Sequence, residues 1–274
     1  MAYENFKPKV WSARIQLELP KFTVFENECN YQFDGEVKKG RSVKILGVGR
    51  PTIGDYTGDS IGTPEVIPDT AILMPIDQAK YFNFMVDDVD AAQAADGQMD
   101  ALLEGSIRAL AEERDKYIAR LCAQDCGASS GSLAITDKLS VKAAVDSALV
   151  QLMSQGVSLG SDRVTVYLSP KAFLYFADYV LDTRTQNDAA LQSGVLGRYM
   201  GCSVKMSNNF YNDGTDDHLF VKTDKAVAFA SGLDQLKAYR PQNLFSDAVR
   251  GLNTFGGRVV RPKELYVIRA HYTA

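Results

Sequence analysis

The first ninety residues combine short strand-like segments with turns and contain no long helical pattern. Arg14–Leu19 alternates polar and apolar residues with a period of two, and Lys21–Phe25, Val43–Leu46 and Lys80–Val86 are further short runs typical of extended structure. No helix is predicted before residue 80 that would cover these strands. The pattern therefore predicts a first third of the chain with few means of burying its own apolar residues.

Glycine and proline punctuate the stretch Gly47–Pro75, which holds five glycines and four prolines. This composition excludes a helix and offers little to pack a core, so it predicts a long protruding hairpin or loop. A loop of this length is uncommon inside a compact domain unless it is functional. We therefore expect it to lie on another molecule.

A single long amphipathic helix is predicted at Gln98–Gln124. Apolar residues recur along it at steps of four, three, seven and four, and they are Leu103, Ile107, Leu110, Tyr117 and Leu121. At about 1.5 Å per residue the helix is about 40 Å long. The stripe predicts an ordinary core-facing helix that needs no cofactor.

After the helix, Gly127–Ser132 is rich in glycine and serine and predicts a linker into a mixed region. The helices predicted beyond it are Ser140–Gln155 and Lys171–Leu181, and the strands are Arg163–Leu168, Cys202–Met206, Leu219–Lys222, Ala226–Ala230, Leu236–Arg240, Asp247–Phe255, Arg258–Arg261 and Leu265–His271. Strands on both sides of the long helix indicate an α+β fold. We expect them to meet in one sheet, with the middle region inserted between them.

Composition narrows the class of protein. The 274 residues are 46% hydrophobic, which is enough for one large or two modest cores without disulfides or metals. No apolar run has the length of a signal peptide or a membrane span. Four scattered cysteines are typical of reduced thiols, so we expect a cytoplasmic protein. The net charge of −4 argues against a dedicated nucleic-acid-binding protein.

One segment imitates a catalytic motif without its structural context. Gly127-Ala-Ser129-Ser-Gly131 matches the G-x-S-x-G pattern, but it follows a helix, whereas a nucleophile elbow follows a strand. A Ser-His-Asp triad would need one of the only two histidines, His218 in a turn-rich stretch or His271 at a strand end. We predict that the protein is not an enzyme; a hydrolase built on Ser129 and His218 is the competing hypothesis.

Cofactor and metal signals are incomplete in the same way. Gly47-Val-Gly49 follows a strand as a dinucleotide-binding loop does, but the third glycine and the following helix are missing. Cys122 and Cys126 lie one helical turn apart, and no second pair or nearby histidine completes a zinc site. The acidic turn Asp213–Asp217 lacks EF-hand spacing. The sequence therefore predicts no cofactor and no metal.

Three blocks of sequence, taken in their order and spacing, resemble a known family. They are Ile72–Gln93 (ILMPIDQAKYFNFMVDDVDAAQ) with Arg108-Ala-Leu-Ala and Asp115 of the long helix, Gly194–Val204 (GVLGRYMGCSV) with Ser207-Asn-Asn209, and Val249–Leu265 (VRGLNTFGGRVVRPKEL). Together they span nearly the whole chain. They resemble the major capsid proteins of tailed bacteriophages, which have the Hong Kong 97-type capsid fold that encapsulins share.

The resemblance implies a division of the chain into the parts of that fold. They are an N-terminal arm (1–42), an extended β-hairpin loop (43–79), a peripheral domain (80–126 and 231–274) with Gln98–Gln124 as its spine helix, and an axial domain (127–230). The arm and the loop are expected to lie across neighbouring subunits. Those subunits would then cover the strand edges that the first third leaves open.

The function implied is that of a coat protein. Pentamers and hexamers of the chain would self-assemble in the bacterial host cytoplasm into an icosahedral shell, the virion capsid, around double-stranded DNA held without sequence specificity. A portal and a decoration protein are further partners of such shells, and no membrane is involved. An encapsulin-like compartment that encloses cargo enzymes is the alternative.

Two features of the chain bear on how such a shell would mature. The sequence begins at Met1 without the large scaffolding segment that some members cleave, so a separate scaffolding protein is expected. No lysine lies between Ile45 and Ala79. The lysine-to-asparagine cross-link that welds some related shells is therefore not expected.

Charge predicts how one subunit contacts the next. The loop between Pro51 and Ala79 has no lysine or arginine and carries Asp55, Asp59, Glu65, Asp69 and Asp77, whereas Lys237–Ala274 has seven basic residues against two acidic ones. We expect the acidic loop of one subunit to lie over basic groups of its neighbour, and the proposed contact residues are Asp55, Asp59, Glu65 and Asp69 with Arg250, Arg258, Arg261 and Lys263. Packaged DNA or solvent is the alternative partner of these arginines, because exposed ion pairs are individually weak.

Overall fold

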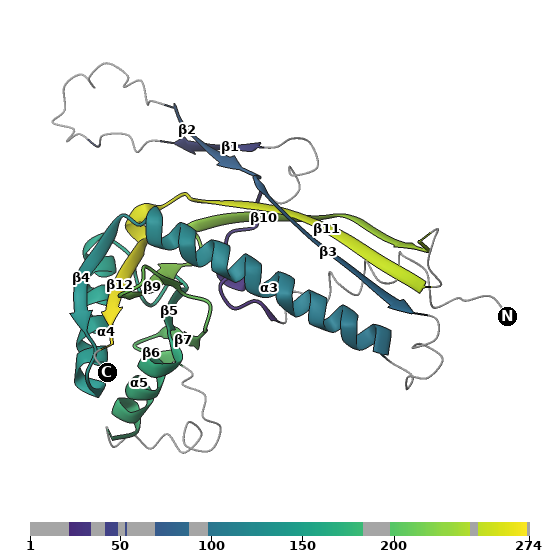
Figure 1. Ribbon diagram of the computed structural model, residues 1–274. Coiled ribbons are helices and arrows are strands. Elements are labelled where there is room, and N and C mark those ends of the chain that lie inside the picture. The colour runs from purple at the N-terminus through teal and green to yellow at the C-terminus, as the bar shows by residue number, and fades with distance from the viewer. Residues whose placement is uncertain are drawn as a thin grey trace, which may run out of the picture.

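The long helix lies beneath a three-stranded sheet and leads into a second unit built on a larger sheet (Figure 1). The computed structural model describes residues 22–33, 42–48, 53, 69–87, 98–182, 198–241 and 246–272. A two-stranded hairpin projects from the three-stranded sheet, on the side away from the helix. The predicted α+β class is confirmed.

The elements of the described residues follow one another as strands, three α-helices and two short 3₁₀ turns. In chain order they are η2 (Glu26–Glu28), β1 (Ser42–Val48), β2 (Asp69–Pro75), β3 (Gln78–Asp87), α3 (Gln98–Gln124), β4 (Ala128–Ala134), α4 (Lys138–Ser154), β5 (Val164–Leu168), α5 (Pro170–Asp182), β6 (Arg198–Tyr199), β7 (Cys202–Met206), β8 (Tyr211–Asn212), β9 (Asp217–Thr223), β10 (Val227–Tyr239), β11 (Ser246–Val259), η4 (Pro262–Glu264) and β12 (Leu265–His271).

The three-stranded sheet joins strands from the two ends of the chain. Its order is β10-β11-β3, and β3 pairs antiparallel with β11 from Phe255 opposite Gln78 to Ser246 opposite Asp87. The expectation that strands from before the long helix meet C-terminal strands is therefore correct for β3, β10 and β11. It is wrong for β12, which follows the η4 turn and pairs with β4 and β9 in the other sheet. The domain bounds stay a prediction.

Helix α3 has the predicted bounds and buries the first three residues of the predicted stripe, whereas Tyr117 and Leu121 are half-buried and Ile118 and Cys122 are the buried residues of that half. Leu103, Ile107 and Leu110 are buried and pack against Phe82 of β3. Farther along, the rings of Tyr117 and Phe255 meet edge to face with centroids 5.4 Å apart. The helix thus covers one face of the three-stranded sheet, as its periodicity requires.

The larger sheet has the order β4-β12-β9-β5-β7-β6, with β8 beside β9, and is packed against α4 and α5. Parallel strands β5 and β7 are connected through α5, which extends the predicted helix Lys171–Leu181 by one residue at each end. Helix α4 begins with a capping box between Asp137 and Ser140. The two helices contact each other, and their buried residues form one core with the sheet.

The predicted linker at Gly127–Ser132 is instead part of a strand. Residues Ala128–Ala134 form β4, which pairs in parallel with β12 at one end of the larger sheet. Its sequence, ASSGSLA, has little intrinsic preference for extended structure. Pairing with β12 decides its conformation, which is how tertiary context overrides propensity.

The described part of the N-terminal arm, residues 22–33, packs against its own subunit. Phe25 is fully buried and its ring lies 4.9–5.2 Å from those of Tyr167, Phe210 and Phe220. Residue 25 has α-helical backbone angles, and η2 follows, so the extended structure predicted through Phe25 is wrong there. The expectation that the arm lies across neighbours is likewise corrected for this segment. Arg14–Leu19 lies outside the described residues.

Buried polar groups of α3 hold this segment in place. The Asp115 carboxylate accepts hydrogen bonds from the backbone N–H groups of Val24, Phe25 and Glu26 at 2.9, 3.1 and 3.4 Å. Beside it, Arg114 Nη1 lies 2.6 Å from Glu26 Oε1. Burial raises the pKa of Asp115 to about 6, against the lowering effect of the three N–H donors. These contacts fasten the chain where the two sheets meet.

The two ends of the predicted loop pair with each other and form the projecting hairpin, as expected for its base. Strands β1 and β2 pair antiparallel from Ser42 opposite Pro75 to Val48 opposite Asp69. The base sits tightly on β11, because a Cβ added to Gly256 would lie 2.1 Å from the Pro75 carbonyl oxygen. Only glycine fits at that position.

None of the helices described combines the length and apolar character needed to cross a membrane.

Candidate inter-subunit contact site

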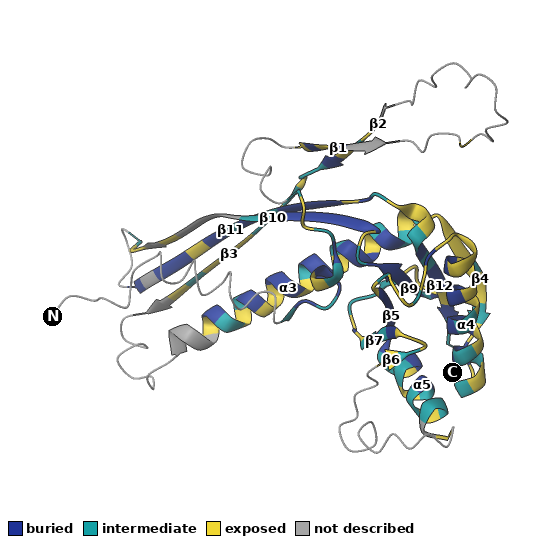
Figure 2. Cartoon of the chain, turned by 180° about the vertical axis from the view of Figure 1, so that it is seen from behind, coloured by how far each residue is buried: buried dark blue, intermediate teal, exposed yellow. Residues whose placement is uncertain are grey.

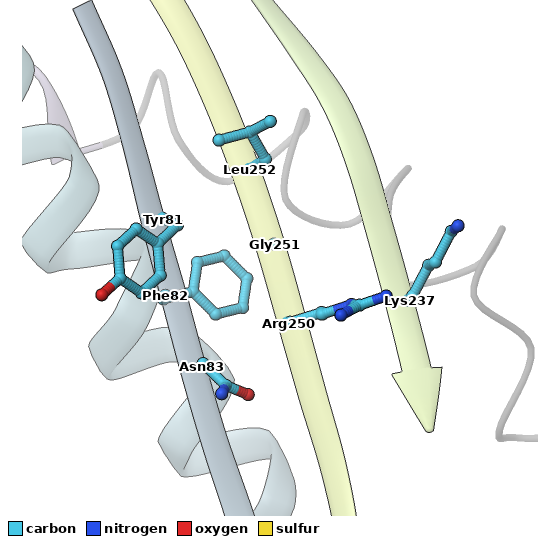
Figure 3. A pocket seen from close by; sticks show the side chains of 7 residues that line it. All are labelled: Tyr81, Phe82, Asn83, Lys237, Arg250, Gly251 and Leu252. Atoms are coloured by element: carbon cyan, nitrogen blue, oxygen red, sulfur yellow. The ribbon is translucent and has the colours of Figure 1, made fainter. Parts of the chain in front are cut away.

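Two basic side chains share the face of the three-stranded sheet that is turned away from α3. Asn253 and Phe255 of β11 contact α3, so the even-numbered neighbours in that strand point to the other side. Arg250 is one of these, and it stands opposite Lys237 of β10 and Asn83 of β3. Directly opposed residues lie on one face of a sheet, so the three side chains form a cluster (Figure 3).

The cluster lines a groove with both cationic and aromatic walls, which we call the Arg250 groove. Its volume is about 290 Å³, and its lining residues are Tyr81, Phe82, Asn83, Lys237, Arg250, Gly251 and Leu252. The guanidinium carbon of Arg250 lies 5.1 Å from the ring centroid of Tyr239, whose hydroxyl donates to Asn83 Oδ1 at 3.3 Å. Tyr81 is 78% exposed. An arginine held over an aromatic ring beside exposed apolar surface is suited to a carboxylate on a partner protein.

The other predicted basic residues lie at the opposite end of β11, and two of them already have partners. Arg258 Nη1 is 3.3 Å from Asp125 Oδ2, and Arg261 Nη1 is 2.9 Å from Glu264 Oε1. Lys263 is exposed and, in the part of the chain that is described, pairs with no carboxylate. It lines a second pocket of about 250 Å³ with residues of β4, α4 and β12.

The predicted basic residues therefore form two sites. Arg250 and Arg258 are eight residues apart in one continuous strand, which corresponds to about 27 Å at about 3.4 Å per residue. One side chain of a neighbour cannot reach both. Because Arg258 and Arg261 are paired within the chain, Arg250, Lys237 and Lys263 are the more available cations.

The acidic half of the predicted contact falls outside the described residues. Asp55, Asp59 and Glu65 are among the residues that the structure does not describe, and the same holds for the side chain of Asp69, the first residue of β2. The pairing of acidic loop and basic groups stays a prediction.

Sequence reasoning missed the aromatic members of the groove. Tyr81 and Met85 of β3 are 78% and 60% exposed, whereas Phe82 packs on α3. The segment YFNFM places apolar residues on both faces of one strand. That pattern is the signal in the sequence, because strands that are covered on both faces read as near-continuous apolar runs.

The candidate catalytic residues are not assembled into a triad. Ser129 lies in β4 opposite Val267, at a sheet edge and not at a strand-to-helix elbow. His218 Nε2 is 3.3 Å from Asp213 Oδ2, and His271 Nδ1 is 3.1 Å from Asp216 Oδ1. Each histidine therefore has an acidic partner of its own in the Asp213–Asp217 turn.

The remaining motifs serve structural roles. Cys122 is fully buried and Cys126 half-buried, and burial raises the pKa of both thiols, which fits packing in an apolar core. Asp213 accepts hydrogen bonds from the backbone N–H groups of Thr215 and Asp216, which lower its pKa to about 2 and close the turn. Gly47 lies within β1 opposite Thr70. No group of three or more metal-ligating side chains occurs among the residues described.

Comparison with solved structures shows which proteins share this architecture. A structure from Mycobacterium phage Che8 is 30% identical over 90% of this chain and 90% of its own, with a TM-score of 0.74. The chain belongs to the major capsid protein family of tailed bacteriophages. The capsid structure of the cyanophage P-SCSP1u matches this capsid protein with a TM-score of 0.72 at 16% identity, covering 92% of this chain and 89% of the other.

The same fold extends to a more distant shell. The crystal structure of a virus-like particle from Pyrococcus furiosus matches this chain with a TM-score of 0.61 at 11% identity. The match covers 95% of this chain and 98% of the chain from the particle. No protein-family model matches the sequence, and no curated protein matches it. The capsid protein therefore has the Hong Kong 97-type fold, and it is a shell-forming homo-oligomer of the virion.

Proposed function

We propose that this protein is the coat of a tailed phage, with pentamers and hexamers forming an icosahedral shell around double-stranded DNA. The observation that carries the proposal is the 30% identity to the Mycobacterium phage structure over 90% of both chains. An overall charge of −4 fits this role, because a strongly basic lining would hold the incoming duplex by its phosphates. The protein acts without catalysis and without a cofactor.

The proposed parts of the subunit follow the predicted bounds. Residues 1–42 act as arm, 43–79 as extended loop, 80–126 and 231–274 as peripheral domain, and 127–230 as axial domain, apart from β12, which lies in the larger sheet. Assembly takes place in the host cytoplasm with a separate scaffolding protein and a portal as partners. The DNA is enclosed without sequence recognition.

An encapsulin-like compartment is the second candidate. The virus-like particle from Pyrococcus furiosus shares the architecture over 98% of its chain, although at only 11% identity. The same subunit fold serves both functions, so the contents of the particle separate them.

The test is to purify particles from cells in which the protein is produced with its natural neighbours. Electron microscopy is expected to show icosahedral shells, and nuclease-protected double-stranded DNA is expected to co-purify with them. Shells that hold a folded enzyme and no DNA would instead support the compartment. A protein that yields no particle under any of these conditions would contradict both.

We also propose that the Arg250 groove receives the acidic loop of a neighbouring subunit. Its support is the charge contrast between the two segments, together with exposed Tyr81 and a guanidinium that pairs with no carboxylate of the described residues. Lys263, at the other site, is the second cation available to the loop. Arg258 and Arg261 are expected to matter less, because each is held by an acid of its own chain.

Reversing the charge of the groove should impair assembly. Arg250→Glu is expected to lower the yield of closed shells by at least about tenfold, because like charges brought together cost several kcal/mol and about 1.4 kcal/mol is already tenfold. Sedimentation of assembled against free subunits measures the change. Lys225→Glu, on an exposed residue of the β9–β10 turn, alters net charge equally and is expected to leave the yield unchanged.

Reversing the loop acids as well distinguishes loss of the proposed contact from misfolding of the subunit. Combining Arg250→Glu with Asp55→Lys and Asp59→Lys is expected to restore part of the yield. If Arg250→Glu shells form as well as the unmodified ones, the groove does not receive the loop.

A further inference from the structure

We propose that residues 22–33 form a releasable strap that fixes the angle between the three-stranded sheet and the larger sheet of one subunit. The strap lies beside the middle of α3, where Figures 1 and 2 show it from the two sides, in purple in Figure 1. It binds to elements of both sheets, so it joins them in addition to the covalent connections. The proposal concerns a single subunit and goes beyond the shell-forming function proposed above.

On the side of the three-stranded sheet, the strap is bound to α3 and β10. The Asp115 carboxylate, with its three backbone N–H donors, and the ion pair beside it attach the first half of the strap to α3. The second half reaches the edge of β10, where the Asn30 N–H donates to the Val227 carbonyl oxygen at 2.8 Å and the Phe229 N–H donates to that of Asn30 at 3.1 Å. This pairing is a single parallel bridge and not a ladder.

On its other side, the same segment is bound to the larger sheet. The Lys222 ammonium group of β9 donates to the carbonyl oxygen of Glu28, and Lys205 Nζ of β7 lies 2.7 Å from Glu28 Oε1. The ring of Phe25 packs against aromatic rings of β5 and β9. Twelve residues therefore hold elements of both sheets together.

The covalent connections between the two sheets lie close together, away from the middle of α3. They run from α3 to β4, from β9 to β10 and from β11 to β12. The Gly127 N–H donates to the Pro262 carbonyl oxygen at 3.2 Å, and the Val260 N–H donates to that of Ala226 at 2.9 Å. Asp115 lies nine residues before the end of α3, which is about 14 Å along the helix. A contact at this distance from the connections resists rotation of one sheet against the other.

Buried charges gather beneath the strap, which is the reason to expect that it can be released. Five Asp, Glu, Lys or Arg residues are buried among the residues whose burial is described, and Asp216 is the one that lies elsewhere. The four at the strap are Glu26, Arg114, Asp115 and Lys222. Buried charges have lost their hydration, and opening of the strap would restore it. The net free energy that keeps the strap in place is therefore smaller than its many contacts indicate, as in segments that open locally before the whole protein unfolds.

A fixed angle matters to a subunit that builds a shell. The angle between the two sheets decides the shape of the subunit, and the shape of the subunit decides the curvature of the assembly. The bound strap selects one angle, and the released strap permits the hinge at the connections to take several.

Thiol labelling of the unmodified protein tests the release. Cys29 lies in the strap and is 7% exposed, whereas Cys202 lies in the core of the larger sheet and is fully buried. In unassembled subunits without denaturant, an alkylating reagent is expected to label Cys29 while Cys202 stays unlabelled, as peptide mass spectrometry will show. If Cys29 reacts only when Cys202 does, the segment leaves its site only on global unfolding and the proposal is wrong.

A substitution beneath the strap should speed its release. Asp115→Asn keeps the size of the side chain and removes the charge that the three N–H groups share, so Cys29 is expected to react at least about tenfold faster while Cys202 stays unlabelled. Asp125→Asn makes the same change on the same helix, where Asp125 pairs with Arg258 and not with the strap, and is expected to leave the rate unchanged. An unchanged rate in Asp115→Asn would contradict the proposal.

A distance measurement tests whether the strap sets the angle. Met85 of β3 and Leu174 of α5 are 60% and 66% exposed and belong to different sheets, so spin labels attached through p-acetylphenylalanine at these two positions report on it by electron paramagnetic resonance. We expect one narrow distance distribution in the otherwise unmodified subunit and in Asp125→Asn, and a broader one in Asp115→Asn. A distribution that stays narrow although Cys29 reacts faster would show that the strap opens without controlling the angle, and would overturn the proposal. Both experiments use free subunits, so their outcome is separate from that of the test for DNA-filled shells.

Discussion

Replacing Arg114 by methionine is expected to lower the free energy of unfolding by about 3–5 kcal/mol, the cost of breaking a buried ion pair. Its guanidinium and the Glu26 carboxylate are each 5% exposed and lie 2.6 Å apart. Removing the cation leaves a carboxylate in the core without its principal counter-charge. Arg114 Nε also donates to Asn253 Oδ1 at 3.2 Å, so the same substitution loosens α3 from β11. Thermal and urea unfolding of the unassembled subunit measure the loss.

Arg108→Met provides the matched control on the same helix. Arg108 pairs with Glu104 at 2.8 Å, but both side chains are largely exposed, so its loss should cost less than about 1 kcal/mol. Adding Glu26→Gln to Arg114→Met is expected to recover part of the stability, because no uncompensated charge then remains. Equal losses from Arg108→Met and Arg114→Met would show that the buried pair does not hold the N-terminal segment.

Local periodicity predicted most of the regular elements because they bury one regular face. Gln98–Gln124 was predicted to the residue, as were Cys202–Met206 and Leu265–His271. In the first two the apolar positions repeat at the period of the element, and in Leu265–His271 a short continuous apolar run marks the strand, so the sequence displays each of them directly. The sequence does not show which strands pair with one another. The prediction that the C-terminal strands share one sheet with the strands before the long helix is therefore wrong for β12, which pairs with β4.

The two main errors share a physical cause. β4 consists of small residues whose strand conformation comes from its neighbour β12, and the segment around Phe25 is fixed by the Asp115 carboxylate ninety residues away. Both conformations are decided by long-range contacts. Neither segment contains a sequence pattern that predicts its conformation.

The candidate contact site was predictable in its charges and not in its geometry. The basic excess of Lys237–Ala274 pointed to Arg250, Arg258, Arg261 and Lys263 as one set. The structure divides that set, because Asp125 and Glu264 engage two of its members and the length of β11 separates the others. A count of charges does not reveal which of them are already paired.

The largest effect on assembly is expected from deleting residues 54–65 of the extended loop. Strands β1 and β2 would stay paired, because Val48 lies opposite Asp69 and residues 49–53 and 66–68 leave eight to connect them. The close packing of Pro75 on Gly256 is also untouched, so the thermal unfolding of the subunit should hardly change. Without the loop, however, the contact with the neighbour is lost in every copy of the shell. Light scattering and electron microscopy are expected to show soluble subunits or capsomers and no closed shells.

A replacement of the same length tests whether assembly needs the length of the loop or its acidic residues. When residues 54–65 are exchanged for twelve glycine and serine residues, the connection is as long as before but Asp55, Asp59 and Glu65 are gone. If the acids dock on a neighbour, this variant should fail to close shells as the deletion does. If it assembles and the deletion does not, span alone is needed and the acidic contact is wrong. Normal shells from the deletion itself would show that the loop is not needed for assembly, and other surfaces of the subunit would then have to supply the contacts between copies.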